Sequence, residues 1–157
     1  MGIVYKLGQG EMLDAIEELW VKLNRHHHDN SPYFKHEYEI FTFAIRKKML
    51  VDKLIEGSIH IDLAVDDNSG QSVAYCVSTV NDDKSGEIES LYVEAAYRRM
   101  GIGSELMKRA LAWMDEQGAK ERTLMVAVGN EAAFGFYSRY GFFPRFTMLK
   151  QTEPVSG

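Results

Sequence analysis

Hydrophobic residues recur along this chain with two different periods, and the change of period separates expected helices from expected strands. A short strand is expected over residues 3–7, and helical spacing of apolar residues follows from Met12 to Leu23. Residues 24–35 are polar and contain three histidines and Pro32, so a loop is expected there. A second helix is expected over 38–49, because Tyr38, Phe41, Ile45 and Met49 fit one helical face.

From Ile59 onward the apolar residues alternate, which is typical of strands. Strands are expected over 59–65, 72–80 and 87–93, joined by turns at 66–70 and 81–86 into an antiparallel meander. A helix over 103–117 would end at Gly118, and a strand over 123–128 would follow. Asn130 could cap a short helix that runs to Tyr140, and a last strand is expected over 142–149.

These elements predict an α/β (α+β) protein with a mixed, mostly antiparallel central sheet flanked by about four helices. A single domain over 1–157 is expected, since 157 residues is an ordinary domain length and no linker-like segment interrupts the chain. The crossover from the third meander strand through the helix to the next strand makes that last pair parallel.

Composition excludes several classes of protein. The net charge of −5 argues against a nucleic-acid binder, because such binding depends on a basic surface. No apolar run reaches the roughly 18 residues of a membrane span, and the first residues lack a secretion-signal pattern, so a cytoplasmic protein without a membrane partner is expected. The lone Cys76 has apolar neighbours and is expected in the core.

The strongest chemical signal lies between the strand over 87–93 and the helix that follows it. Residues 98–103 read Arg-Arg-Met-Gly-Ile-Gly and lead directly into the helix. Glycines allow close backbone approach to a ligand, and the first turn of a helix presents unpaired amides that favour an anion. Two arginines add charge beside it, which predicts a diphosphate site.

Two other phosphate motifs do not fit this segment. A dinucleotide fold needs a third glycine three residues after Gly103, where Leu106 stands, and an acidic residue ending the next strand, near Gly129. A Walker loop needs Gly-Lys-Ser/Thr, which is absent. A glycine turn with two solvated arginines is the remaining structural alternative.

The chain resembles the GCN5-related N-acetyltransferase (GNAT) superfamily, whose pattern Gln/Arg-x-x-Gly-x-Gly/Ala is met by residues 98–103. A second family block is matched by Asn130, Ala133, Phe136-Tyr137 and Gly141-Phe142. The strong resemblance covers about residues 87–146. It implies direct acetyl transfer from acetyl-CoA (coenzyme A), within a ternary complex, to a primary amine of a small molecule, polyamine or protein.

The resemblance also implies positions for the cofactor. Leu91, Tyr92 and Val93 would pair with the pantetheine arm, and Asn130, Phe136 and Tyr137 would lie near its thiol end. The diphosphate would be held by Arg98, Arg99, Met100, Gly101, Ile102, Gly103 and Ser104.

The resemblance further suggests the groups that move protons. Tyr137 would protonate the departing thiolate, although a core aromatic is its structural alternative. Glu87 and Glu89 lie two apart on one strand, so either could act as base, directly or through water. An exposed acidic pair is the structural alternative. A backbone amide near Leu91 could polarise the acetyl carbonyl if the strand splays from its neighbour.

The histidine-rich segment is expected to contribute to the acceptor pocket. His28 and Asp29 are candidate substrate contacts by the resemblance, with a solvated loop as the alternative. No metal site is expected, because three consecutive histidines do not point at one ion. A non-catalytic acyl-CoA-binding module and an enzyme for longer acyl chains remain alternative functions, and the resemblance leaves a homodimer open.

Overall fold

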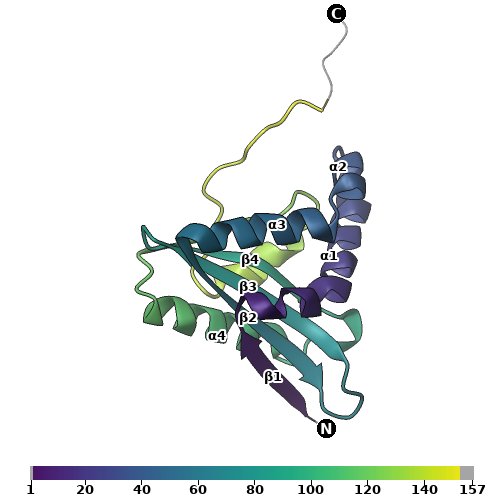
Figure 1. Ribbon diagram of the computed structural model, residues 1–157. Helices are drawn as coiled ribbons and strands as arrows, with labels where there is room; N and C mark the ends of the chain where they lie inside the picture. The colour runs from purple at the N-terminus through teal and green to yellow at the C-terminus, as the bar shows by residue number, and fades with distance from the viewer. Residues whose placement is uncertain (1, 153–157) are drawn as a thin grey trace, which may run out of the picture.

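The computed structural model describes residues 2–152 and contains one five-stranded sheet with the order β1-β2-β3-β4-β5 (Figure 1). The strands are β1 (Ile3–Gly8), β2 (Gly57–Asp66), β3 (Ser72–Asn81), β4 (Ser85–Val93) and β5 (Glu121–Leu124). Neighbours from β1 to β4 pair antiparallel, and β4 pairs parallel with β5. This confirms the predicted mixed, mostly antiparallel sheet.

Five α-helices lie within the described residues, where about four were expected. They are α1 (Glu17–Asn30), α2 (Lys35–Ile40), α3 (Phe43–Lys53), α4 (Ile102–Glu116) and α5 (Phe134–Ser138). Short 3-10 helices add η1 (Gly10–Ile16), η2 (Leu54–Glu56), η3 (Ala95–Tyr97) and η4 (Glu131–Ala133). Within residues 2–152, none of the helices combines the length and the hydrophobicity of a membrane span.

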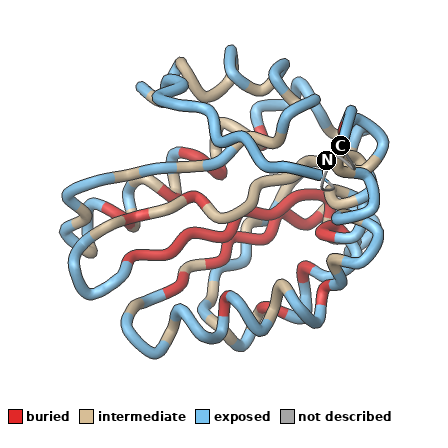
Figure 2. Tube along the Cα trace, turned by 90° about the horizontal axis from the view of Figure 1, so that it is seen from above, coloured by how far each residue is buried: buried red, intermediate tan, exposed pale blue. Residues whose placement is uncertain are grey.

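The sheet is covered on both faces, so its central strands carry apolar side chains in both directions. On β3, Tyr75 and Val77 face a cluster built with η1, α1 and α3, whereas Ala74 and Cys76 face a second cluster built with α4. Figure 2 shows these buried strands between two layers of helix. Cys76 is 1% exposed, which confirms its expected place in the core.

The polar segment after residue 23 is not a loop, because α1 continues through all three histidines to Asn30. The Asn30 side chain closes the helix by donating to the His26 carbonyl at 2.8 Å. Asn24 ties α1 to the following segment through a 2.9 Å bond to the Tyr38 carbonyl. The predicted second helix is in turn divided into α2 and α3, separated at Phe41 and Thr42.

The C-terminal predictions were partly wrong. The strand expected over 123–128 ends at Leu124, and Asn130 makes no side-chain cap to the turn that follows it. Residues 142–149 form no strand, because no neighbouring strand of the described chain pairs with them. Several apolar side chains there are exposed as a result, namely Phe143, Phe146, Met148 and Leu149.

Candidate active site

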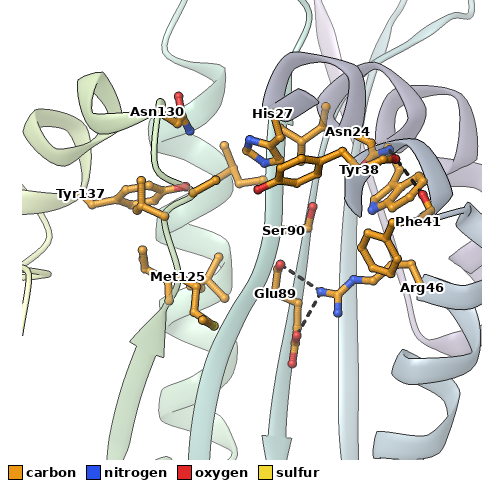
Figure 3. A pocket seen from close by; sticks show the side chains of 17 residues that line it. Asn24, His27, Tyr38, Phe41, Arg46, Glu89, Ser90, Met125, Asn130 and Tyr137 are labelled. Carbon is orange, nitrogen blue, oxygen red and sulfur yellow. Dashed lines mark hydrogen bonds and ion pairs between the residues drawn. The ribbon is translucent and has the colours of Figure 1, made fainter. Parts of the chain in front are cut away.

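The parallel strands β4 and β5 separate after a short region of pairing. Residues 85–88 of β4 pair with residues 121–124 of β5. Strand β4 then continues to Val93, whereas the segment after Leu124 leaves the sheet. A cavity of about 180 Å³ lies where the two segments diverge. Its walls come from residues 88–91, residues 124–127, the helices α1 and α2, and the side chains of Arg46, Asn130 and Tyr137 (Figure 3).

A β-bulge in β4 shapes the floor of this cavity. Val77 is opposite Ser90 and Ser78 is opposite Ile88, so Glu89 is the extra residue. The bulge turns both Glu89 and Ser90 toward the α1 and α3 face. Ser90 Oγ lies 2.6 Å from the buried Tyr75 hydroxyl, and Glu89 reaches α3.

The Glu89 carboxylate is 1% exposed and has three donors. Arg46 Nη2 donates to it at 3.1 Å, the Thr79 hydroxyl donates at 2.6 Å, and the Lys53 ammonium also contacts it. Lys53 lies 3.1 Å from Glu87 as well, so the two glutamates do face the same side of the sheet. Burial lowers the pKa of Lys53, but the hydrogen bonds and charges of Glu89 and Glu87 outweigh it and leave that pKa raised.

The edge of β4 beyond the bulge turns some of its backbone groups toward the opening rather than toward β3. The Glu94 amide donates to the Val73 carbonyl of β3 at 2.8 Å. Successive residues of a strand point their backbone N–H and C=O groups to opposite sides. The backbone groups of Tyr92 therefore face β3, and those of Leu91 and Val93 face the open side. The Val93 carbonyl accepts a 3.0 Å hydrogen bond from Arg98 Nε. Among the three predicted pantetheine contacts, Leu91 and Val93 therefore have the suitable backbone orientation.

The predicted diphosphate turn forms the start of α4. Gly101 has φ +79° and precedes the helix, and the first intrahelical bond runs from the Glu105 amide to the Gly101 carbonyl at 3.0 Å. The amides of residues 102–104 come before that bond and have no i−4 partner within the helix. Arg98, Arg99 and Met100 are exposed beside them, and Ser104 is half-buried.

Two residues of this turn, Ile102 and Gly103, pack against other parts of the protein. The Ile102 side chain is 2% exposed and belongs to the core, so only its backbone faces outward. Gly103 packs against α5, since a Cβ placed there would lie 3.3 Å from the Phe136 ring. That contact sets the start of α4 beside the helix that carries Tyr137.

Tyr137 points its hydroxyl into the cavity from α5 (Figure 3). Burial, with a smaller contribution from Cys76, raises the pKa of Tyr137 to about 12. Within residues 2–152 this hydroxyl has no hydrogen-bond partner, so it is available to a ligand. Asn130 lines the same cavity, and its Oδ1 lies 3.4 Å from His26 Nε2.

His28 and Asp29 do not line the cavity. The His28 ring lies 2.9 Å from Asp29 and 3.1 Å from Glu39, on the outer side of α1 and α2. The cavity is lined instead by the α1 residues Trp20, Leu23, Asn24 and His27. Helical spacing could have identified His27, because it falls seven residues after Trp20 and four after Leu23, on one helix face.

Sequence comparison identifies the family. The sequence profile of the acetyltransferase (GNAT) family matches residues 13–142, so the chain belongs to that family. The chain is also 38% identical over 78 residues to N-alpha-acetyltransferase MAK3 of Arabidopsis thaliana, across 48% of this chain and 41% of that protein. The match thus spans less than half the length of the plant protein.

Solved structures share the fold. A GCN5-related N-acetyltransferase from Ralstonia eutropha superposes with a TM-score of 0.74 at 23% identity, covering 99% of this chain and 100% of that one. PaiA N-acetyltransferase from Thermoplasma acidophilum, solved in complex with coenzyme A, gives 0.66 at 19% identity over 89% of each chain. At these identities the likeness is one of fold.

Proposed function

We propose that this chain transfers an acetyl group from acetyl-CoA to a primary amine. The observation that carries the proposal is the separation of β4 from β5 beyond Ile88 and Leu124, with the Tyr137 hydroxyl facing the resulting cavity. Membership of the acetyltransferase (GNAT) family supports the same reaction.

The cofactor would lie along a continuous path. Its diphosphate would accept hydrogen bonds from the amides that begin α4, where the helix dipole favours negative charge. The Phe136–Gly103 contact places that turn next to α5. The pantetheine arm would then follow the open edge of β4 at Leu91 and Val93, which brings the thioester into the cavity beside Tyr137.

Residues of the cavity could serve the chemistry of transfer. Holding the amine against the thioester carbonyl supplies much of the rate, and hydrogen bonds to the developing oxyanion supply more. The Leu91 amide, on the open edge of β4, would donate to that oxygen. Burial keeps Tyr137 protonated at neutral pH. Its hydroxyl faces the cavity, so it would be the proton donor to the departing thiolate.

Direct transfer in a ternary complex is favoured over a cysteine-bound intermediate. Cys76 is the single cysteine of the chain and is 1% exposed. Burial raises the pKa of its thiol to about 12, which keeps it protonated and a poor nucleophile. The amine should therefore attack the thioester itself.

An assay for thiol release tests the proposal. Acetyl-CoA would be offered with spermidine, with free lysine and with a short peptide that carries a free α-amino group. The proposal predicts amine-dependent thiol release with at least one of these and intersecting initial-velocity plots. Binding of acetyl-CoA without release on any of them would contradict it and favour a binding module.

A further inference from the structure

His27 is the member of the histidine run that reaches the cavity. In Figure 3 its ring and the Tyr38 hydroxyl are turned toward the space that the Tyr137 hydroxyl also faces. The Nδ1 atom of His27 is fully covered and has no hydrogen-bond partner in the described part of the chain. A covered, unpartnered polar nitrogen is costly, so its presence on a cavity wall points to a role.

The surroundings of His27 keep its ring neutral. Burial lowers the pKa of His27, and the nearby His26 lowers it further. Its ring centroid lies 6.0 Å from that of His26 and 5.8 Å from that of Tyr38. Protonation would place a positive charge on a largely buried ring beside a second imidazole, which explains the direction of the shift.

The two glutamates are less suited to accept a proton from the amine. The Glu89 carboxylate already accepts from Arg46, Lys53 and Thr79, so its oxygens are occupied and its charge is stabilised. Glu87 pairs with Lys53 and lines a different cavity, of about 480 Å³, near Asp52 and Ser85.

We propose that His27 accepts the proton that the acceptor amine loses during acetyl transfer. The inference rests on the proposed function and assigns a proton acceptor within the same cavity. Nε2 is the ring nitrogen that would take the proton, because Nδ1 is covered.

Every proton in the proposed reaction has a donor and an acceptor. The amine binds neutral, having left its extra proton in solvent, and its nitrogen attacks the acetyl carbonyl carbon. The new C–N bond leaves a positively charged nitrogen, which passes one proton to His27 Nε2. The C–S bond then breaks, and the thiolate takes the Tyr137 proton. Proton return from His27 to the Tyr137 oxygen, through solvent, restores the starting state.

The charges facing His27 set the expected pH dependence. The titratable or charged groups around this cavity come from five elements. They are His26 on α1, Tyr38 on α2, Arg46 on α3, Glu89 on β4 and Tyr137 on α5. Arg46 and Glu89 pair with each other at 3.1 Å, and Lys53 also contacts the Glu89 carboxylate. Because the neutral ring is the active form, turnover should rise with pH through a midpoint below 6.5, the ordinary histidine value.

Substitution of His27 tests this role. His27→Gln should lower kcat by about 10²-fold to 10⁴-fold with the amine panel above, and the acidic limb of the kcat profile should disappear. Acetyl-CoA binding, followed by the rise in melting temperature, should be unchanged. His28→Gln is the matched control, because His28 lies one residue away on the outer side, and it should keep both kcat and the acidic limb.

A second measurement does not depend on turnover. Carbon–proton correlation NMR of the histidine rings should show a signal with a titration midpoint below 6.5 that is missing from His27→Gln. A midpoint at or above 6.5 for His27, or full kcat with an intact acidic limb in His27→Gln, would overturn the inference alone. No turnover by the unsubstituted protein would overturn the proposed function and this inference with it.

Discussion

Arg46 on α3 is hydrogen-bonded twice to Glu89 on β4, since its Nη2 lies 3.1 Å from the main-chain carbonyl and 3.1 Å from the carboxylate. The carboxylate side chain is 1% exposed and the arginine side chain 13% exposed, so the pair is shielded from water. It joins the helix that covers the sheet to the bulge that floors the cavity. A structural role for Glu89 follows from this arrangement.

Removal of the carboxylate should therefore destabilise the fold. Glu89→Ala leaves Arg46 without its acidic partner and should lower the free energy of unfolding by about 3–5 kcal/mol. Chemical denaturation measures the change. Lys48→Ala is the comparison, because the Lys48–Asp52 pair is exposed and should contribute less than about 1 kcal/mol. Equal losses from the two substitutions would contradict the buried-pair interpretation.

Diphosphate binding by the turn before α4 can be tested by substituting two glycines, one at each end of that helix. Gly101 and Gly118 have φ of +79° and +72°, and each would accommodate a Cβ without contact within 4 Å. Asp at either position should cost about 1–2 kcal/mol through backbone strain. Gly101→Asp alone should abolish the acetyl-CoA-dependent rise in melting temperature, because its carboxylate would repel the diphosphate. A rise retained in Gly101→Asp would remove the diphosphate from this turn.

The hydroxyl of Tyr137 is expected to act in turnover rather than in cofactor binding. Tyr137→Phe should reduce kcat by about 10²-fold or more while acetyl-CoA affinity changes little. Tyr140→Phe provides the control, since Tyr140 packs on Phe136 but does not line the cavity. Steady-state kinetics and calorimetric titration separate the two effects, and an unchanged kcat in Tyr137→Phe would exclude the hydroxyl from proton transfer.

Stability should fall at alkaline pH because buried acids resist ionisation in the folded chain. Burial raises the pKa of Tyr75, and this adds to the effect of Cys76 and Tyr137. Burial raises the pKa of Cys76 from 9.0 to about 12 and that of Tyr137 from 10.0 to about 12. Above pH 9 the unfolded chain loses these protons first, so it binds fewer protons than the folded chain and the free energy of unfolding decreases as pH rises. Each group adds a slope on the order of 1 kcal/mol per pH unit between its two pKa values.

Denaturation curves between pH 8 and 11 measure that slope, and Cys76→Ala should make it shallower. A free energy of unfolding that does not change across this range would show that none of these groups resists ionisation in the folded state.

The elements of the sheet could be predicted because their patterns are local. Alternation located β2, β3 and β4, and the spacing from Leu106 to Met114 located α4. The continuation of α1 through His26–His28 could not be predicted from polarity, because it depends on contacts such as that between Asn24 and the Tyr38 carbonyl. The strand expected over 142–149 failed for a related reason, since a strand needs a partner that local sequence does not specify.

The features of the candidate site also differ in whether local sequence could predict them. The turn at residues 98–104 and Tyr137 could be located from the family motif, whose glycines and aromatic pair are contiguous in sequence. The bulge at Glu89 depends on register with β3 and left no local signal. The loop predicted from polarity has no helical face, so the sequence pattern gave no reason to prefer His27, which lines the cavity, over His28.

A crystal structure with bound coenzyme A tests the central claim most directly. The account predicts diphosphate oxygens within about 3 Å of the amides that begin α4, and the pantetheine arm between β4 and residues 125–127 with its sulfur beside the Tyr137 hydroxyl. Coenzyme A bound elsewhere on the molecule, with these amides and the opening between β4 and β5 free of it, would contradict the account.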